Sequence, residues 1–246
     1  MLYYLEMAEA LLHLLPPLPV ESEIGAVEII ALGHSGFRVR GKDVTLVIDP
    51  PAPSYGYSLK GISADIICLT HDHPGHNHVQ GVGGKPYIVR GPGEYEIGGV
   101  LITALRSFHD DKHGEERGSN TIYIIHLEDV MICHLGDLGH ALNAAQQQQI
   151  AGADVLMIPV GGHTTINAAM AVEIKGEVEP TITVPMHYST SIAGTGTATG
   201  RATPLDPVDT FFHALGIPLP DPLAKLVLTR TSIPAEPQVV ILSPKG

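Results

Sequence analysis

The sequence predicts an α/β fold in which strands alternate with a few helices. Short apolar runs bounded by glycine and proline recur along the chain, which is typical of strands. Three later segments carry apolar residues at helical spacing. In addition, polar residues recur just after predicted strands, where α/β proteins usually hold their functional groups.

The elements follow from these patterns in chain order. Strands are expected at 26–32, 36–40, 44–48, 64–70, 86–90, 100–107, 121–127, 130–134, 154–158, 181–184, 226–229 and 239–242. Helices are expected at 142–151, 165–175 and 207–215. Residues 50–61 should form a loop, and Gly91-Pro92-Gly93 a tight turn.

Composition limits the class of protein. With 246 residues, 44% hydrophobic and 16% charged, the chain can bury a substantial core, and we expect a single domain over 21–246. The net charge of -12 argues against nucleic acid as a partner, because a basic surface is needed to neutralise phosphates. Cys68 and Cys133 lie in apolar runs and are expected to be buried reduced thiols, which fits a cytoplasmic protein.

Two segments outside this pattern need their own interpretation. Residues 1–20 should form an apolar N-terminal helix and a linker. The helix is too short to span a bilayer and lacks signal-peptide features, so it should dock on the domain or on another copy of a homo-oligomer. The small, polar stretch 191–200 should be a loop, either bordering a pocket or lying on the surface.

The strongest functional signal is the segment 69–78, Leu-Thr-His-Asp-His-Pro-Gly-His-Asn-His. It places four imidazoles in one short loop after a strand. A neutral imidazole offers a lone pair to a divalent metal, and a buried ring without a partner costs free energy. Other candidate ligands follow separate strands, namely His109, Asp137 and His187. A fold that aligns these strand ends would form a metal site.

In this order the residues resemble the metallo-β-lactamase superfamily, whose signature is His-x-His-x-Asp-His followed by a single His, Asp and His. The phrases Leu32-Gly33-His34-Ser35-Gly36, Gly91-Pro92-Gly93-Glu94-Tyr95 and His134-Leu135-Gly136-Asp137 are similar to its Zn-dependent hydrolase branch. That branch is similar to the ascorbate-phosphate lactonase and, more distantly, to phospholipase D-type and ribonuclease members. The resemblance covers the chain from about residue 23 onward.

The resemblance implies a four-layer αββα sandwich of two similar halves, with a metal cleft along one edge. It implies His71, His73 and His109 as ligands of a first ion, His76 and His187 as ligands of a second, and Asp137 as the bridge. Asp49 would support the ligand loop. Zinc is the expected metal, as one or two ions, although Mn, Fe or Ni would also suit such donors. Asp137 and His76 would be catalytic, with metal-activated water as the nucleophile.

Gly75 departs from the signature, because it stands where the family usually has Asp. The second site should therefore lose an oxygen ligand and a negative charge. Water could fill the position, the chain could hold only the first ion, or it could have lost catalysis and kept binding. Asp72 is a poor substitute, since its side chain should point away from those of its neighbours.

Other polar residues have two interpretations each. His34, His140, His163 and Arg117 could bind substrate; otherwise His34 is a turn residue, the other two histidines are exposed, and Arg117 pairs with Glu115 or Glu116. His134 is expected to support the site without binding metal.

We therefore expect a metal-dependent hydrolase that opens a lactone, ester or amide carbonyl of a small molecule. The alternatives are a phosphodiesterase or nuclease of the same fold, and a non-catalytic binding or structural protein. If Gly75→Asp created activity where there was none, the last alternative would be favoured.

Overall fold

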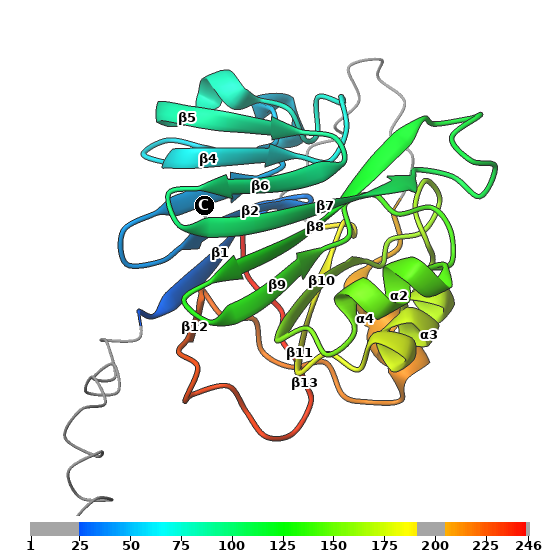
Figure 1. Cartoon of the computed structure of the whole chain (residues 1–246). Coiled ribbons are helices and arrows are strands. Elements are labelled where there is room, and N and C mark those ends of the chain that lie inside the picture. Colours follow the sequence, from blue (N-terminus) through cyan, green and yellow to red (C-terminus); the bar gives the residue numbers. More distant parts are fainter. Residues whose placement is uncertain (1–24, 191–204, 245–246) are drawn as a thin grey trace, which may run out of the picture.

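Two mixed β-sheets face each other in the computed structural model, which describes residues 25–190 and 205–244 (Figure 1). The six-stranded sheet has the order β12-β1-β2-β3-β4-β5, with β1 (Val27–Gly33), β2 (Gly36–Arg40), β3 (Thr45–Ile48), β4 (Ser63–Leu69), β5 (Gly83–Arg90) and β12 (Leu226–Leu228). The seven-stranded sheet has the order β13-β11-β10-β9-β8-β7-β6, with β6 (Gly93–Ile97), β7 (Val100–Phe108), β8 (Ser119–Leu127), β9 (Val130–His134), β10 (Val155–Pro159), β11 (Ile182–Met186) and β13 (Gln238–Val239).

Strand direction brings the functional residues to one edge. In the six-stranded sheet β1 and β3 are both antiparallel to β2, and β4 is parallel to β3, so these three strands run the same way. In the other sheet β7 and β9 are both antiparallel to β8, and β11 follows β9 and β10 in parallel. The loops after β1, β3 and β4 therefore leave one end of their sheet, and those after β7, β9 and β11 leave one end of theirs.

The apolar core lies between the sheets because residues of each strand alternate between its two faces. In β4, Ile66 and Cys68 face the seven-stranded sheet, whereas Ile67 and Leu69 face outward. The outer face of the seven-stranded sheet packs against α2 (Ala144–Ile150), α3 (Ala168–Val178) and α4 (Val208–Leu215). Figure 1 shows these three helices gathered on one side of the molecule.

The outer face of the six-stranded sheet has a thinner cover. Among the described residues it packs against the segments that contain two short 3-10 helices, η1 (Pro53–Tyr55) and η2 (Val79–Gly81), through Leu59, Ile62 and Val82. The α/β sandwich predicted from the sequence is confirmed. Its fourth layer, in the described part of the chain, consists of these segments without an α-helix.

The elements differ from the expectations at a few places. β6 was not predicted: its alternating Glu-Tyr-Glu-Ile sequence forms an edge strand beyond the Gly91 turn. α2 and α3 begin later than expected because Asn143 and Asn167 cap their first backbone N–H groups. The predictions for residues 1–20 and 191–200 fall outside the described residues.

Cys68 and Cys133 are buried free thiols, as predicted. Burial raises the pKa of both thiols, so neither is a reactive thiolate. No helix in the described ranges has both the length and the apolar character needed to cross a bilayer.

Candidate metal centre

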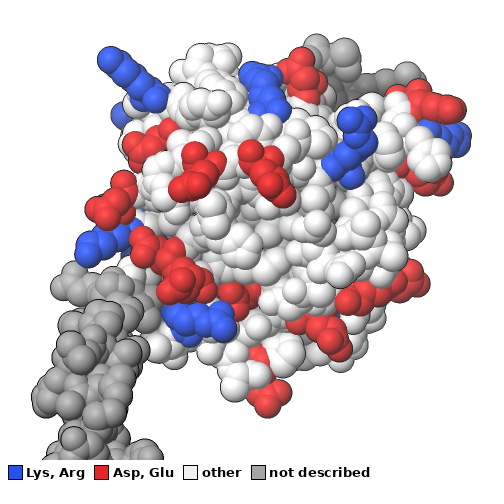
Figure 2. Space-filling model, viewed as in Figure 1, with Lys and Arg blue, Asp and Glu red and all other residues white. Residues whose placement is uncertain are grey.

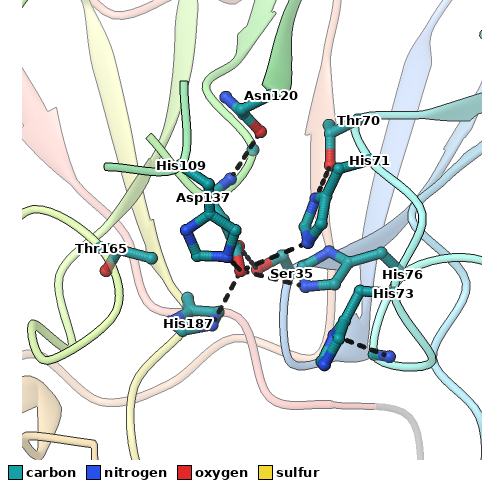
Figure 3. Close-up of polar contacts among 12 residues, drawn as sticks. Ser35, Thr70, His71, His73, His76, His109, Asn120, Asp137, Thr165 and His187 are labelled. Carbon is teal, nitrogen blue, oxygen red and sulfur yellow. Dashed lines mark hydrogen bonds and ion pairs between the residues drawn. The ribbon is translucent and has the colours of Figure 1, made fainter. Parts of the chain in front are cut away.

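The Asp137 carboxylate lies at the centre of a cluster of imidazoles (Figure 3). Its Oδ2 atom is 3.2 Å from Nε2 of His76, 3.2 Å from Nε2 of His109 and 3.1 Å from Nε2 of His187. Nε2 of His71 lies 3.9 Å from the same oxygen. The fold thus brings four of the five histidines expected to bind metal around one carboxylate oxygen of Asp137, the sixth expected ligand.

A hydrogen-bonded chain behind the cluster fixes which nitrogen of two rings carries its proton. Thr70 Oγ1 donates to Asp49 Oδ2 at 2.6 Å, so it must accept from Nδ1 of His71 at 2.9 Å. Asp49 Oδ2 also accepts from Nδ1 of His76 at 2.9 Å. Nδ1 therefore carries a proton in both rings, and Nε2 is the atom of each ring that could bind a metal beside Asp137.

These two Nε2 atoms are the clearest sign of a bound cation. Both are buried and have no hydrogen-bond partner among the described residues. Burial and nearby His76 lower the pKa of His71 to about 3, so its ring is neutral at pH 7. A lone pair that faces a carboxylate oxygen is repelled unless a cation lies between them. The donor set, neutral imidazoles with one carboxylate, fits a divalent transition metal.

Asp137 and the histidines beside it shift one another's pKa values. Burial opposes the ionisation of Asp137, but His187 and His76 hold the pKa of its carboxyl well below the ordinary value. Burial alone would also lower the pKa of His76, but Asp137 and Asp49 outweigh it and raise this pKa to about 10. A proton and a metal ion therefore compete for Nε2 of His76.

Asp137 is oriented by two groups from other elements. Ser35 Oγ donates to its Oδ1 atom at 3.3 Å, which leaves Oδ2 to the imidazoles. The backbone N–H of Asp137 donates to Oδ1 of Asn120 at 3.0 Å, and Nδ2 of Asn120 donates to the Leu135 carbonyl oxygen at 2.9 Å. The carboxylate is thus fixed before any ligand binds.

The grouping of ligands differs from the one that the resemblance implied. His71 and His109 lie with Asp137 in one group that could hold a metal ion, whereas His73 groups with His71 and His76. His73 is exposed, its Nδ1 accepts from the Gly75 N–H at 3.3 Å, and Tyr55 Oη lies 3.5 Å from its Nε2. In this geometry His71, His73 and His109 do not form one set.

A third group consists of His34, His76, Asp137 and His187, whose ligand atoms all lie within 4.8 Å of one another. His34 follows β1 and was expected only as a substrate-binding or turn residue. Its ring lies beside Gly75: a Cβ atom at that position would be 2.9 Å from Cδ2 and 3.1 Å from Nε2 of His34. Asp72 points elsewhere, towards Nδ2 of Asn77 at 2.5 Å.

Two glycines let the ligand loops pack directly against one another. A Cβ atom at Gly139 would be 2.4 Å from the backbone N of Asp110 and the backbone C of His109. A Cβ atom at Gly161 would be 2.1 Å from the carbonyl oxygen of His187. Because the facing atoms are backbone, a side chain at either position would displace a ligand.

The other predicted residues lie outside the cluster. Both ring nitrogens of His140 bond to the main chain, Nε2 to Phe108 N–H at 3.1 Å and Nδ1 to the Ala141 carbonyl at 2.7 Å. His163 is 40% exposed and faces Asp206 at 3.4 Å. Arg117 pairs with Glu116 at 3.4 Å. These contacts agree with the alternative interpretations of the three as loop or surface residues.

Only some of the residues that hold the metal ligands in place could be predicted from the sequence. Asp49 and His134 were expected behind the ligands. His134 donates from Nε2 to the Ser35 carbonyl oxygen at 2.9 Å and accepts the Gly136 N–H at 3.1 Å, so it bonds the β1–β2 turn to the Asp137 loop. Thr70, Ser35 and Asn120 were missed. Thr70 and Ser35 adjoin predicted site residues, but a position beside a ligand does not reveal which hydroxyl turns inward.

Comparisons with known proteins agree with this geometry. Residues 28–187 match the model of a family described as the beta-lactamase superfamily domain. A UPF0173 metal-dependent hydrolase from Staphylothermus marinus is 28% identical over 187 residues, covering 65% of this chain and 82% of that protein. Another, from Pyrococcus horikoshii, is 28% identical over 197 residues, covering 67% of this chain and 85% of that protein.

Solved structures extend the likeness over most of the chain. A crystal structure from Thermotoga maritima, named as a candidate Zn-dependent hydrolase of the metallo-β-lactamase superfamily, is 30% identical with a TM-score of 0.70; the match covers 88% of this chain and 98% of that chain. Igni18, a metallo hydrolase from Ignicoccus hospitalis, is 20% identical with a TM-score of 0.58, covering 82% and 98%, and shares the fold. From the family match and these likenesses, the chain belongs to the metallo-β-lactamase superfamily.

Proposed function

We propose that this chain is a cytoplasmic metal-dependent hydrolase that uses metal-activated water to open a lactone, ester or amide carbonyl. The observation that carries the proposal is the pair of buried Nε2 atoms, of His71 and His76, that face the Asp137 carboxylate and have no hydrogen-bond partner among the described residues. Such a metal supplies a nucleophile by lowering the pKa of water to about 7, and it polarises the bond under attack. The relatives named metal-dependent hydrolases support this assignment.

The chain's own residues have distinct tasks in this proposal. His71, His76, His109, His187 and Asp137 hold the metal. Asp49 and Thr70 keep the Nδ1 protons of His71 and His76 away from it. The nitrogen-rich donor set suits zinc, although the same donors accept Fe or Ni. Two buried reduced thiols, Cys68 and Cys133, support a reducing compartment.

The surface charge of the molecule supports a small substrate over a nucleic acid. A hollow of about 20 Å³ lies beside His34 and is lined also by Phe37, Tyr57 and Met186, which is space for little more than a water molecule. The face drawn in Figure 2 carries single Lys and Arg side chains interspersed with Asp and Glu. A nucleic acid would instead need a continuous basic surface on the face that it contacts.

A substrate panel tests the proposal. Purified protein is assayed against lactones, aryl esters, amides and phosphodiesters, with and without added Zn(II), together with His71→Ala. As a matched control, His126→Ala removes an exposed imidazole from β8 that lies outside the candidate metal groups. We expect carbonyl hydrolysis that His126→Ala retains and His71→Ala loses by at least about 100-fold. Activity that is unchanged in His71→Ala, or restricted to phosphodiesters, would refute the proposal.

A further inference from the structure

We propose that His34 takes the place of the carboxylate missing at position 75 and is a ligand of a second metal ion, together with His76, His187 and Asp137. The inference rests on the proposed function, because it completes the same metal centre. The second site would then hold its ion without a carboxylate from position 75.

The first argument is the position of the ring. His34 has its ring centroid 4.3 Å from that of His187 and 5.0 Å from that of His76. One ligand atom from each of the four residues lies within 4.8 Å of the others. Three imidazoles and one carboxylate at such spacing can form the four-coordinate set that zinc prefers.

The second argument is the space at position 75. A Cβ atom there would lie 2.9 Å from Cδ2 of His34, closer than nonbonded atoms approach, so the ring fills the space where a side chain would begin. The backbone of Gly75 is outside the left-handed region, so its conformation does not require glycine. With the His34 ring in this position, a side chain at 75 could be accommodated only if the ring moved.

The third argument is how the turn holds His34. His34 has a φ of 56°, a left-handed conformation that is unfavourable for a side chain larger than glycine. Its carbonyl oxygen accepts the N–H of His187 at 3.2 Å, and the next residue, Ser35, donates to Asp137. The turn is thus bonded to the loops of two other ligands. Strained backbone held by such contacts is typical of functional positions.

The exchange has a consequence for metal preference. Replacing a carboxylate by a neutral imidazole removes one negative charge and an oxygen donor. Imidazole suits Zn, Cu, Fe and Ni, whereas carboxylate oxygen suits Mn and Mg. The second site of this chain should therefore favour Zn(II) over Mn(II) more strongly than a site that has the carboxylate.

Metal titration of the full chain tests the assignment without an activity assay. Metal-free protein is titrated with Zn(II) and with Mn(II) by calorimetry, and circular dichroism checks the fold. His34→Gly removes the ring and relaxes the turn, since glycine adopts positive φ freely. His34→Asn is a second variant that also tolerates this conformation. Gly75→Asp alone, the double variant His34→Gly/Gly75→Asp and the control His126→Ala complete the set.

We expect two Zn(II) sites in the wild type and in His126→Ala. His34→Gly and His34→Asn should weaken one site by at least about tenfold and leave the other unchanged. The double variant should regain the second site and bind Mn(II) more tightly than the wild type. Gly75→Asp alone should bind Mn(II) less tightly than the double variant, because the His34 ring has to move first. If both His34 variants bind two Zn(II) ions with wild-type affinity, or if the double variant fails to regain the second site, the assignment is wrong. If the wild type binds no Zn(II), the proposed function itself fails.

Discussion

The Thr70 hydroxyl group determines which ring nitrogen of His71 carries the proton, although it does not face the metal centre. It donates to Asp49 and accepts from His71, and Asp49 in turn accepts from His76. Mutation of groups that orient metal ligands in this way typically lowers metal affinity about 10–100-fold. Thr70 is 3% exposed, so neither of its hydrogen bonds can be replaced by bulk water.

Thr70→Val keeps the shape of the side chain and removes both hydrogen bonds. We expect it to lower the free energy of unfolding by about 1–3 kcal/mol, because buried polar groups of Asp49 and His71 lose a partner. Zinc affinity should fall about 10–100-fold. Thr70→Ser, which keeps the hydroxyl, is the control for both measurements. An unchanged zinc affinity in Thr70→Val would show that the hydroxyl does not fix the His71 tautomer.

At the residue scale, the sequence predicts which residues bind metal better than it predicts which of them lie together. His71, His76, His109, Asp137 and His187 can be named because each follows a predicted strand. The neighbourhood of His34 and Gly75 cannot be predicted, because it depends on how a turn after β1 packs against a loop that follows β4. His73 shows the converse: its signature position is clear, but its ring lies apart from that of His109.

At the scale of elements, the ligand loops depend on close backbone approach. Gly161, after β10, packs against the carbonyl oxygen of His187, after β11, and these two strands are parallel neighbours. The contact holds His187 against the edge of the sheet. Any Cβ atom at position 161 has to push the His187 backbone away.

Gly161→Ala should therefore lower zinc affinity and reduce the free energy of unfolding by about 1–3 kcal/mol, because a methyl group overpacks the contact. Gly176→Ala is the matched control: it lies within α3, where an added Cβ atom would have nothing within 4 Å of it. It should raise stability by about 0.5–1 kcal/mol and leave zinc affinity unchanged. Calorimetric titration and denaturant unfolding measure both effects; wild-type zinc affinity in Gly161→Ala would contradict the account.

The predicted elements were accurate where the apolar pattern was strong. β2 and β9 begin and end as expected because every second residue of each packs into the core between the sheets and turns bound both strands. β6 was missed because an edge strand with two exposed glutamates resembles a loop in composition. The helix starts moved because the capping asparagines, not the apolar period, decide where a helix begins.

At the scale of the whole molecule, the candidate metal centre joins the two sheets. His34, His71 and His76 come from loops of the six-stranded sheet, and His109, Asp137 and His187 from loops of the seven-stranded sheet. The packed halves could not be deduced from composition or periodicity; only the resemblance implied a sandwich. A ligand set divided between two sheets couples metal binding to the stability of the whole fold.

The acid stability of the molecule should depend on Asp110, which organises the loop after His109. Its carboxylate accepts backbone N–H groups of Lys112, Gly114, Glu116 and Arg117 at 2.7–3.0 Å. Removal from water on its own would raise the pKa of Asp110, but these hydrogen bonds lower it. A lowered pKa stabilises the fold above the unfolded value of about 3.9, and this stability is lost as the pH falls through the folded value.

Asp110→Asn replaces one acceptor oxygen with a donor and removes the charge. We expect the variant to be less stable than the wild type at pH 7, with the difference in free energy of unfolding shrinking as the pH falls below about 4. Urea unfolding across this pH range measures the difference. A gap that stays constant with pH would mean that the ionised carboxylate does not organise the loop.

The claim that the cluster is a metal centre is tested most directly by the metal content of protein purified without chelator. Elemental analysis of the wild type, His71→Ala and His126→Ala gives equivalents per chain. We predict zinc at about two equivalents in the wild type and in His126→Ala, and at most about one in His71→Ala. A wild-type chain that retains no divalent transition metal, and takes up none when Zn(II) is added, would contradict the account.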